Sequence, residues 1–149
     1  MEVHVGADYR GFKKKQRLAE YLSSRGYDVV DEGAFTYQEG DDFNTPAVAV
    51  AKAIRENRGS MGILICDSAH GVTMQANRFK GVRAAHCSDA ESAELAREHD
   101  DANILCMSAH SMDESAMQTV AEMFLQTHFD ALERRVRRIN LLDEREDYD

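Results

Sequence analysis

The sequence predicts an α/β protein: a Rossmann-like three-layer sandwich in which a five-stranded parallel sheet carries helices on both faces, with a further helix at the C-terminus. Three observations support this prediction. Short apolar stretches alternate with segments whose apolar residues recur at helical spacing. The helical segments are about 10 to 15 residues long, which is typical of βαβ units and hence of parallel pairing. The stretch 63–71, Ile-Leu-Ile-Cys-Asp-Ser-Ala-His-Gly, has the pattern of a strand end, a small polar turn and a helix start.

The predicted strands are the five apolar stretches at 2–7, 27–30, 61–66, 81–87 and 103–107. The predicted helices lie at 12–25, 46–54, 72–79, 89–99, 112–124 and 129–139. Local signals mark several helix ends: Gly26 follows the first helix as a C-cap glycine, Pro46 suits a first turn, and Asp89 suits an N-cap. Residues 32–45 are rich in Gly, Asp, Glu and Asn, which indicates a loop.

Composition predicts a single domain. The chain has 149 residues, of which 43% are hydrophobic, and neither a linker nor an internal repeat divides it. The whole of 1–149 is therefore expected to form one domain, with an acidic tail at about 142–149. The net charge of −9 argues against a nucleic-acid partner, because phosphate binding needs a basic face.

The location expected for the protein is the cytoplasm. No run approaches the ~20 apolar residues that span a bilayer, and the N-terminus lacks the basic and apolar blocks of a signal peptide, so no membrane association is expected. The three cysteines, Cys66, Cys87 and Cys106, are odd in number and form no CxxC pair. This pattern favours reduced thiols in a reducing compartment over a disulfide framework.

The last predicted helix carries an apolar stripe beside a run of arginines. The stripe consists of Phe129, Leu132, Val136 and Ile139. In so small a domain a lone helix of this kind needs a surface to cover it, and a second subunit meets that need, so a homodimer or homotetramer is predicted with this helix at the interface. The alternative is that the helix folds back on its own sheet.

Cys66 is the first candidate for catalysis. It ends a predicted strand, and in an open parallel sheet ligands bind outside the carboxyl ends of the strands. The alternative is a packing role, because free cysteine is among the most buried residue types. Two further predicted strands bring candidates with them: Asp8 follows the first strand, and His99 with Asp100 precedes the fifth. A thiol, a carboxylate and an imidazole around one crevice suit general acid–base chemistry, although Asp8 also suits a helix cap and His99 a surface position.

The order and spacing of several motifs resemble the ribose-5-phosphate isomerase B and galactose-6-phosphate isomerase family. The resemblance runs from Val3 to about Ile139 and rests on Gly6-Ala7-Asp8, Gly11-Phe12, Gly33, Asp42-Phe43, Gly62 to Cys66, Ala76-Asn77, Gly81 to Ala84 and Arg97 to Leu105. It implies an aldose–ketose isomerase that acts on a small sugar without a metal or an organic cofactor. It also implies a site at a subunit interface, with basic residues of the partner's C-terminal helix reaching the substrate.

The resemblance assigns roles to particular residues. Cys66 takes a proton from the carbon next to the carbonyl and so produces an enediolate. Ser68 and the main-chain N–H groups of residues 69–71 stabilise the developing oxyanion, a task that suits a turn opening a helix. Asp8 and His99 help to open the ring form of the sugar.

The chain departs from the family pattern around this expected site. Tyr9 stands where the family usually has histidine, Asp100 where it commonly has asparagine, and Asp-Ser-Ala-His-Gly replaces the glycine-rich turn after Cys66. His110 and Ala131 stand in place of two arginines that contact phosphate in the family, whereas Arg135 is retained. The candidate substrate-binding residues are Tyr9, Arg10, Asp67, Ala69, His70, Gly71, Asp100, His110 and Arg135.

These replacements make the expected site more negative. A phosphate ester carries nearly two negative charges and is best held by bidentate arginine, so an unphosphorylated sugar suits this site better. Asp67 would raise the pKa of the Cys66 thiol and repel an enediolate unless it points away or is paired with His70 or Arg10, and Ala69 replaces glycine poorly if the turn requires a positive φ. Two alternatives stay open: a sugar-phosphate isomerase with rearranged anion binding, and a non-catalytic protein that binds a small polar ligand on the same fold.

A metal site is a weaker interpretation of the same region. It would draw on Asp8, Asp67, His70, His99, Asp100 and His110. Two histidines and a carboxylate suit a transition metal, but the sequence has no HxH or HxxxH pair that would present two ligands on one element. No metal is therefore predicted.

Overall fold

The structure is a computed structural model that describes residues 1–144. Strands and helices alternate through most of the chain. In chain order they are β1 (Glu2–Ala7), α1 (Phe12–Ser24), β2 (Asp28–Asp31), α2 (Asn44–Glu56), β3 (Met61–Cys66), α3 (His70–Ala76), β4 (Ala84–His86), α4 (Ala90–Asp100), β5 (Ile104–Ser108), α5 (Glu114–Gln126) and α6 (Glu133–Glu144).

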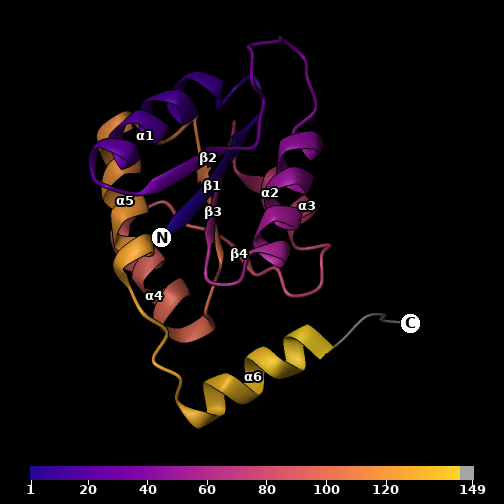
Figure 1. Cartoon of the computed structure of the whole chain (residues 1–149), viewed down its shortest axis with the longest axis vertical. Helices are drawn as coiled ribbons and strands as arrows, with labels where there is room; N and C mark the ends of the chain where they lie inside the picture. The colour runs from indigo at the N-terminus through magenta and orange to yellow at the C-terminus, as the bar shows by residue number, and fades with distance from the viewer. Residues whose placement is uncertain (145–149) are drawn as a thin grey trace.

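The five strands form one parallel sheet in the order β2-β1-β3-β5-β4. In Figure 1 their carboxyl ends point upwards, toward the loop between β2 and α2, and α6 lies below the sheet. The central strands β1, β3 and β5 are almost wholly buried, as expected for strands covered on both faces. The predicted α/β class and five-stranded parallel sheet are confirmed.

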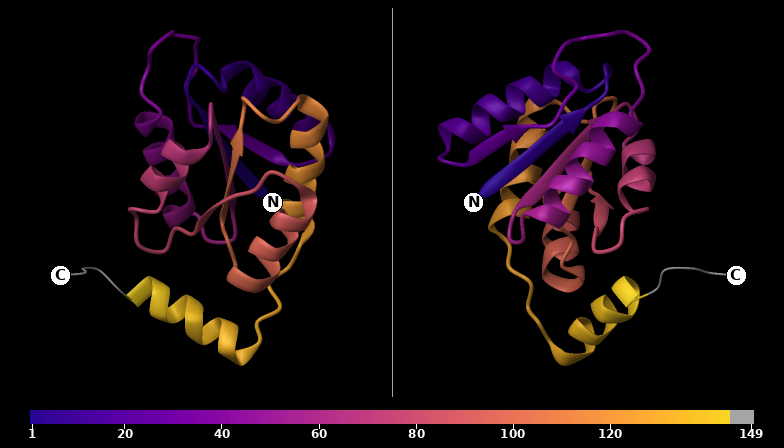
Figure 2. Two further views of the ribbon diagram at one scale, coloured as in Figure 1. Left: turned by 180° about the vertical axis from the view of Figure 1, so that it is seen from behind. Right: turned by 45° about the vertical axis from the view of Figure 1, so that its right-hand side comes forward.

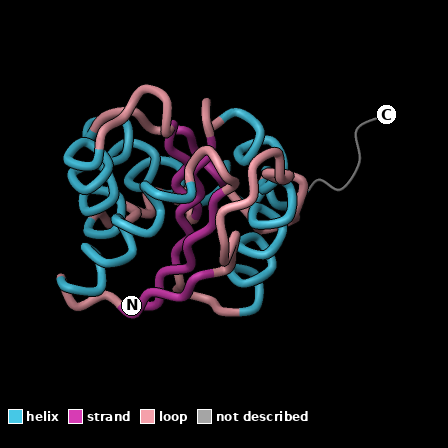
Figure 3. The backbone as a smooth tube through the Cα atoms, turned by 90° about the horizontal axis from the view of Figure 1, so that it is seen from above, coloured by secondary structure: helices cyan, strands magenta, loops and turns pink. Residues whose placement is uncertain are grey.

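Helices cover both faces of this sheet. Figure 3 shows the sheet edge-on between two groups of helices. Helices α1, α4 and α5 pack together on one face, while α2 and α3 pack together on the other. Each face has its own apolar core: Phe124 and Leu105 belong to the first, Val50 and Leu64 to the second. Cys66 lies in the second core, beneath the start of α3.

Several predicted helix ends are confirmed. Asp89 caps α4 by accepting a hydrogen bond from the Ser92 N–H at 2.8 Å. Gly26 follows α1 with a φ of +93°, and Pro46 lies in the first turn of α2. The strand predicted at 81–87 is shorter, at Ala84–His86. Before this strand, a side-chain amide adds to the main-chain bonds: Asn103 Oδ1 accepts from the Arg83 N–H at 2.7 Å, and the Asn103 N–H donates to the Arg83 carbonyl at 2.9 Å.

Helix α6 differs from its prediction at both ends. It begins at Glu133 rather than at residue 129, because Asp130 accepts a hydrogen bond from the Leu132 N–H and Ala131 takes a left-handed φ of +54°. At the other end it continues to Glu144, so residues 142–144 of the predicted acidic tail are helical; the rest of that tail lies outside the described residues. In both views of Figure 2, α6 lies apart from the sheet and from the helices that cover its two faces.

Helix α6 leaves its apolar side chains uncovered. None of its residues is buried, and its exposed apolar side chains include Val136, Leu141 and Leu142. Within residues 1–144, no helix combines the length and the apolar character that crossing a membrane requires. The three cysteines are free and buried, as predicted.

Candidate active site

Asp8 and Cys66 lie side by side at the carboxyl ends of two neighbouring strands. Ala7, the last residue of β1, is in register with Ile65 of β3, and Asp8 and Cys66 follow directly. Both residues are buried, with relative exposures of 7% and 5%. The parallel register therefore brings the predicted carboxylate and the predicted thiol to the same level of the same sheet edge.

The turn after Cys66 is held in place by the end of β5. The Ala109 N–H donates to the Cys66 carbonyl at 2.9 Å, and the His110 N–H donates to the Asp67 carbonyl at 3.0 Å. The Ser108 hydroxyl adds a third bond to the Asp67 carbonyl at 2.6 Å. His110 thus lies at the carboxyl edge as predicted, and its main chain helps to fix the backbone beside Cys66.

Ala69 takes the backbone conformation that glycine would take in this turn. Its φ is +71° and its ψ is −10°, a left-handed conformation that costs a residue with a Cβ about 1 kcal/mol or more. The Ser68 hydroxyl accepts a long hydrogen bond from the His70 N–H at 3.3 Å. Gly71 cannot be replaced as easily, because a Cβ there would come within 2.8 Å of the Phe43 ring. The turn therefore keeps its shape despite the alanine.

Asp8 closes the turn that leads into α1. Its Oδ1 accepts hydrogen bonds from the main-chain N–H groups of Arg10 at 3.0 Å and Gly11 at 3.1 Å. Burial raises the pKa of Asp8 above its ordinary value, and the carboxylates of Asp41 and Asp67 add to the rise, while the two N–H donors oppose it. Asp8 therefore closes the turn before α1 but does not cap the helix, whose N-cap position is Gly11 without a side-chain bond, and the same residue adjoins Cys66 at the strand ends.

Two tyrosine side chains, Tyr9 and Tyr37, lie next to each other close to Asp8 at this edge of the sheet. The rings of Tyr9 and Tyr37 meet edge to face with centroids 6.2 Å apart, and the Arg10 guanidinium lies 5.3 Å from the Tyr9 centroid. These three residues line a cavity of about 280 Å³ together with Lys13 and Glu39. A side-chain hydrogen bond with Tyr9 is the main cause of a raised pKa for Arg10, and the charge of Asp67 contributes. The charge of Asp67 therefore acts on Arg10, one of the two residues considered as its partner.

Several residues of this edge were not predicted from the sequence, Tyr37 among them. Asp41, in the loop at 32–43, accepts a hydrogen bond from the Tyr9 N–H at 2.8 Å. His86, the last residue of β4, meets His70 with ring centroids 5.7 Å apart, and burial followed by the charge of His70 lowers its pKa. A signal existed for His86, because it occupies the carboxyl end of a predicted parallel strand.

Cys66 is distinguished from the other cysteines by its surroundings. Cys106 lies within β5, and full burial raises its pKa to about 12, so its thiol stays protonated near neutral pH. Burial also raises the pKa of Cys87, which packs in the core on the opposite face from Cys66. Cys66, in contrast, adjoins the turn and Asp8.

His99 and Asp100 do not join this edge, and the expectation that three strand ends converge there is wrong for a single subunit. Both residues end α4. A helix that leaves the carboxyl end of one parallel strand must return to the amino edge before the next strand begins. The five residues of β5, at about 3.3 Å each, separate the two edges by ~17 Å.

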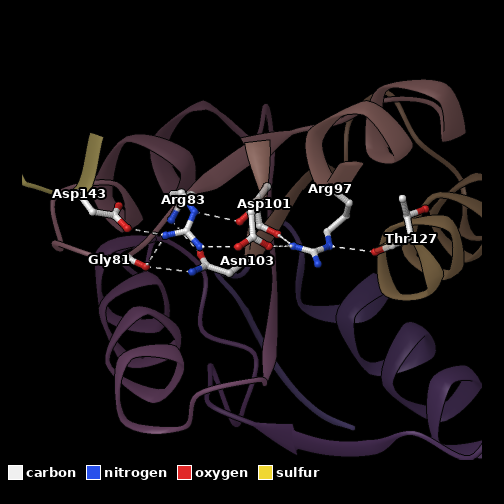
Figure 4. A network of polar contacts seen from close by, with 8 residues as sticks. Gly81, Arg83, Arg97, Asp101, Asn103, Thr127 and Asp143 are labelled. Atoms are coloured by element: carbon white, nitrogen blue, oxygen red, sulfur yellow. Dashed lines mark hydrogen bonds and ion pairs between the residues drawn. The ribbon is translucent and has the colours of Figure 1, made fainter. Parts of the chain in front are cut away.

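A polar network anchors the end of α4 at the amino edge (Figure 4). Arg97 donates to Asp101 Oδ1 at 2.8 Å and to the Thr127 carbonyl at 3.2 Å. Arg83 bridges Asp101 to Asp143 of α6, with Nη1 2.9 Å from Asp143 Oδ2. His99 therefore lies in a segment that several ion pairs and hydrogen bonds hold in place.

Arg135 also lies at the amino edge. Its guanidinium pairs with Asp130, whose main-chain N–H donates to the Glu98 carbonyl at 3.1 Å. Ala131 precedes the helix rather than lying in it, so positions 131 and 135 are not one helical turn apart on α6. Arg135 and His99 are thus neighbours, and both are remote from Cys66 of the same subunit.

The residues of the metal interpretation are divided between the two edges. Asp8, Asp67, His70 and His110 lie at the carboxyl edge and His99 and Asp100 at the amino edge. Among the described residues, potential ligand atoms come together instead at Glu98, His99 and Asp130, all within 4.8 Å of one another. Because Asp130 already pairs with Arg135, a metal ion there would compete with an ion pair.

Comparison with known proteins places the chain in a family. Residues 3–142 match the model of the ribose/galactose isomerase family. Ribose-5-phosphate isomerase B of Mycobacterium tuberculosis is 32% identical over 146 residues, which cover 98% of this chain and 90% of that protein. Ribose-5-phosphate isomerase B of Escherichia coli is 30% identical, with 97% of each chain covered.

Solved structures give the same result. The crystal structure of ribose-5-phosphate isomerase B from Mycoplasma genitalium with bound ribulose-5-phosphate superposes with a TM-score of 0.91 at 34% identity, covering 95% of this chain and 93% of that one. The enzyme from Thermotoga maritima superposes with a TM-score of 0.92 at 33% identity, covering 97% and 98% of the two chains. The five-stranded parallel sheet agrees with these similarities, and the chain belongs to the ribose/galactose isomerase family.

Proposed function

We propose that the protein is an aldose–ketose isomerase whose active site joins the carboxyl edge of one subunit to the amino edge of another, and whose substrate is a sugar without phosphate. The observation that carries this proposal is the position of Cys66 beside Asp8 at adjacent strand ends, in a member of the ribose/galactose isomerase family. The chemistry requires no cofactor, because the hydrogen shift is internal to the sugar.

Cys66 is the proposed base. Its thiolate removes the proton from the carbon next to the carbonyl, the electrons of that C–H bond form a C=C bond, and the carbonyl electrons move onto oxygen to give an enediolate. The Cys66 thiol then returns a proton to the former carbonyl carbon, the proton of the neighbouring hydroxyl passes to the enediolate oxygen, and the oxygen of that hydroxyl becomes the new carbonyl. Ser68 and the main-chain N–H groups of 69–71 stabilise the oxyanion, and Asp8 with His99 moves the hydroxyl protons during ring opening.

The proposed site needs two subunits because its parts lie at opposite edges. Cys66 and Asp8 end strands at the carboxyl edge, whereas His99 and Arg135 lie about one strand length away. The uncovered apolar side chains of α6 supply a surface for a second copy of the chain. A two-fold pair, the commonest oligomer, would complete two equivalent sites at once.

The charges around Cys66 favour an uncharged substrate. Asp8, Asp41 and Asp67 lie close enough for the two other carboxylates to raise the pKa of Asp8. The Arg10 guanidinium beside them is already engaged with Tyr9 and lies in the field of Asp67. Tyr9 and Tyr37 offer ring faces that suit the C–H surface of a sugar better than they suit an anion.

The experiment that tests this proposal follows deuterium exchange by NMR in D₂O. Unphosphorylated tetroses, pentoses and hexoses are compared with ribose 5-phosphate, allose 6-phosphate and galactose 6-phosphate. The expected result is exchange at the carbon next to the carbonyl of a free sugar, lost in Cys66→Ala and kept in Cys87→Ala. Faster exchange with a phosphate ester would overturn the substrate assignment. If none of the sugars exchanges deuterium, the proposed isomerase activity is overturned and the non-catalytic binding protein is favoured.

A further inference from the structure

Asp130 lies between His99 and Arg135, the two residues of the amino edge that are proposed to complete the active site of a second subunit. The residue lies between α5 and α6, and its main-chain N–H donates to the Glu98 carbonyl at 3.1 Å, next to His99. Its Oδ1 accepts from the Leu132 N–H at 3.1 Å, which helps to start α6. Its Oδ2 pairs with the guanidinium of Arg135.

The side chains of the ion pair between Asp130 and Arg135 are partly covered, although Asp130 as a whole residue is exposed. The Arg135 side chain is 15% exposed and that of Asp130 is 23% exposed, so the pair is screened less than an ion pair in open solvent. The other arginines of this helix, Arg134, Arg137 and Arg138, are exposed. Among the four arginines of this helix, Arg135 is thus the one whose charge is compensated by a carboxylate of the described residues, that of Asp130.

A phosphate ester would have to compete for this guanidinium. Arginine binds phosphate through paired N–H donors, and a donor that faces a carboxylate is not free for that bond. The carboxylate also adds a like charge beside any incoming anion, which is a common way to reject the wrong ligand. An uncharged sugar meets neither penalty.

We propose that Asp130 is a specificity-determining residue: by pairing with Arg135 it withholds that arginine from anions and selects a sugar without phosphate. This inference rests on the proposed function, since it requires Arg135 to face a substrate bound at Cys66 of the partner. It goes further by assigning the selection to one carboxylate rather than to the missing arginines alone. It also makes the selection reversible by one substitution.

The test removes the charge of Asp130 and keeps its hydrogen bond with the Leu132 N–H. In Asp130→Asn the amide oxygen still accepts from the Leu132 N–H, so the start of α6 is preserved. Binding of inorganic phosphate and of ribose 5-phosphate to the full-length protein is measured by isothermal titration calorimetry. Asp130→Asn is expected to bind both about tenfold more tightly than the unmodified protein.

Two controls assign the effect to the ion pair. Glu133→Gln removes one negative charge from the exposed first turn of α6 and is expected to leave phosphate affinity unchanged. The double variant Asp130→Asn/Arg135→Gln is expected to lose the gain, because the released guanidinium is then absent. If Asp130→Asn unfolds, Asp130→Ser, which also keeps a cap oxygen without the charge, replaces it.

The outcomes separate this inference from the proposed function. Unchanged phosphate affinity in a folded Asp130→Asn overturns the role of Asp130, as does a gain that survives in the double variant. Because the titration measures binding without turnover, it decides the role of Asp130 even if no sugar exchanges deuterium. The absence of deuterium exchange with every sugar would overturn the proposed isomerase activity without deciding the role of Asp130.

Discussion

The two edges of the sheet hold their functional groups by different means. At the carboxyl edge, main-chain hydrogen bonds and strand register place Cys66, Asp8 and the turn at 67–69. At the amino edge, side-chain ion pairs position the segments that carry His99 and Arg135, through Arg97, Asp101 and Asp130. Backbone geometry tolerates substitution of side chains, whereas an ion pair depends on both partners. The carboxyl edge can therefore keep its shape while its charges change.

Removal of the thiol at the carboxyl edge is the largest expected effect. Cys66→Ala should lower deuterium exchange by about a thousandfold, because a positioned general base contributes roughly 10²–10⁴. Exchange is followed by NMR and folding by circular dichroism. Retention of more than a tenth of the exchange in a folded variant would contradict the assignment of the base.

Breaking the network at the amino edge should cost stability. Arg97→Met leaves the carboxylate of Asp101 without one of its cations and leaves the Ala102 and Thr127 carbonyls without their guanidinium donors, which should lower the free energy of unfolding by about 3 kcal/mol. Urea unfolding measures the loss. The matched control is Arg137→Met on exposed α6, expected to stay within about 0.5 kcal/mol. Equal effects of the two substitutions would argue against an edge braced by ion pairs.

Relief of backbone strain at the carboxyl edge should give a smaller change of opposite sign. Ala69→Gly removes the Cβ from a residue with a φ of +71° and should raise the free energy of unfolding by about 1 kcal/mol. Ala93→Gly, at a buried position within α4, is the control and should destabilise. A loss of stability in Ala69→Gly would show that the turn holds no strain.

The smallest expected effect is a pH dependence from Asp8. Its pKa is raised in the folded protein, so the folded state binds the Asp8 proton more tightly than the unfolded state does. Stability from this group is therefore present at low pH and falls as the pH rises above the ordinary pKa of an aspartate, 3.8, through the raised pKa of the folded state.

Asp8→Asn should make this part of the pH profile flatter, as measured by urea unfolding at a series of pH values. Asp42→Asn, which removes an exposed carboxylate from the neighbouring loop, controls for the loss of one charge. A steeper fall of stability with pH in Asp8→Asn than in the unmodified protein would reverse the expected sign.

Most of the fold was predictable because apolar periodicity records burial. Strands β3 and β5 are buried on both faces and have nearly continuous apolar sequences, while β1 alternates between polar and apolar residues over its first four positions. Asp89 indicates the start of its helix through a local hydrogen bond. The start of α6 was not predictable in this way. Phe129 and Leu132 continue the apolar stripe, but Asp130 and Ala131 stop the helix through a cap and a left-handed residue.

The site was predictable in part, for a related reason. Cys66 and Asp8 are placed by strand ends, which the sequence indicates directly. His99 also adjoins a strand, but which edge it occupies depends on the direction of the helix that precedes it. The ring contact of His86 with His70 joins residues from separate elements, and the left-handed φ of Ala69 is imposed by the folded turn, so neither leaves a local motif.

The most direct test of the two-edge site is complementation between inactive variants. Cys66→Ala and His99→Gln are produced separately and mixed under conditions that exchange subunits, with mixed dimers quantified by native mass spectrometry. If each site takes Cys66 from one subunit and His99 from the other, half of the dimers are mixed and each holds one intact site. About a quarter of the full exchange activity should then return. No recovery in the presence of mixed dimers would contradict the shared site.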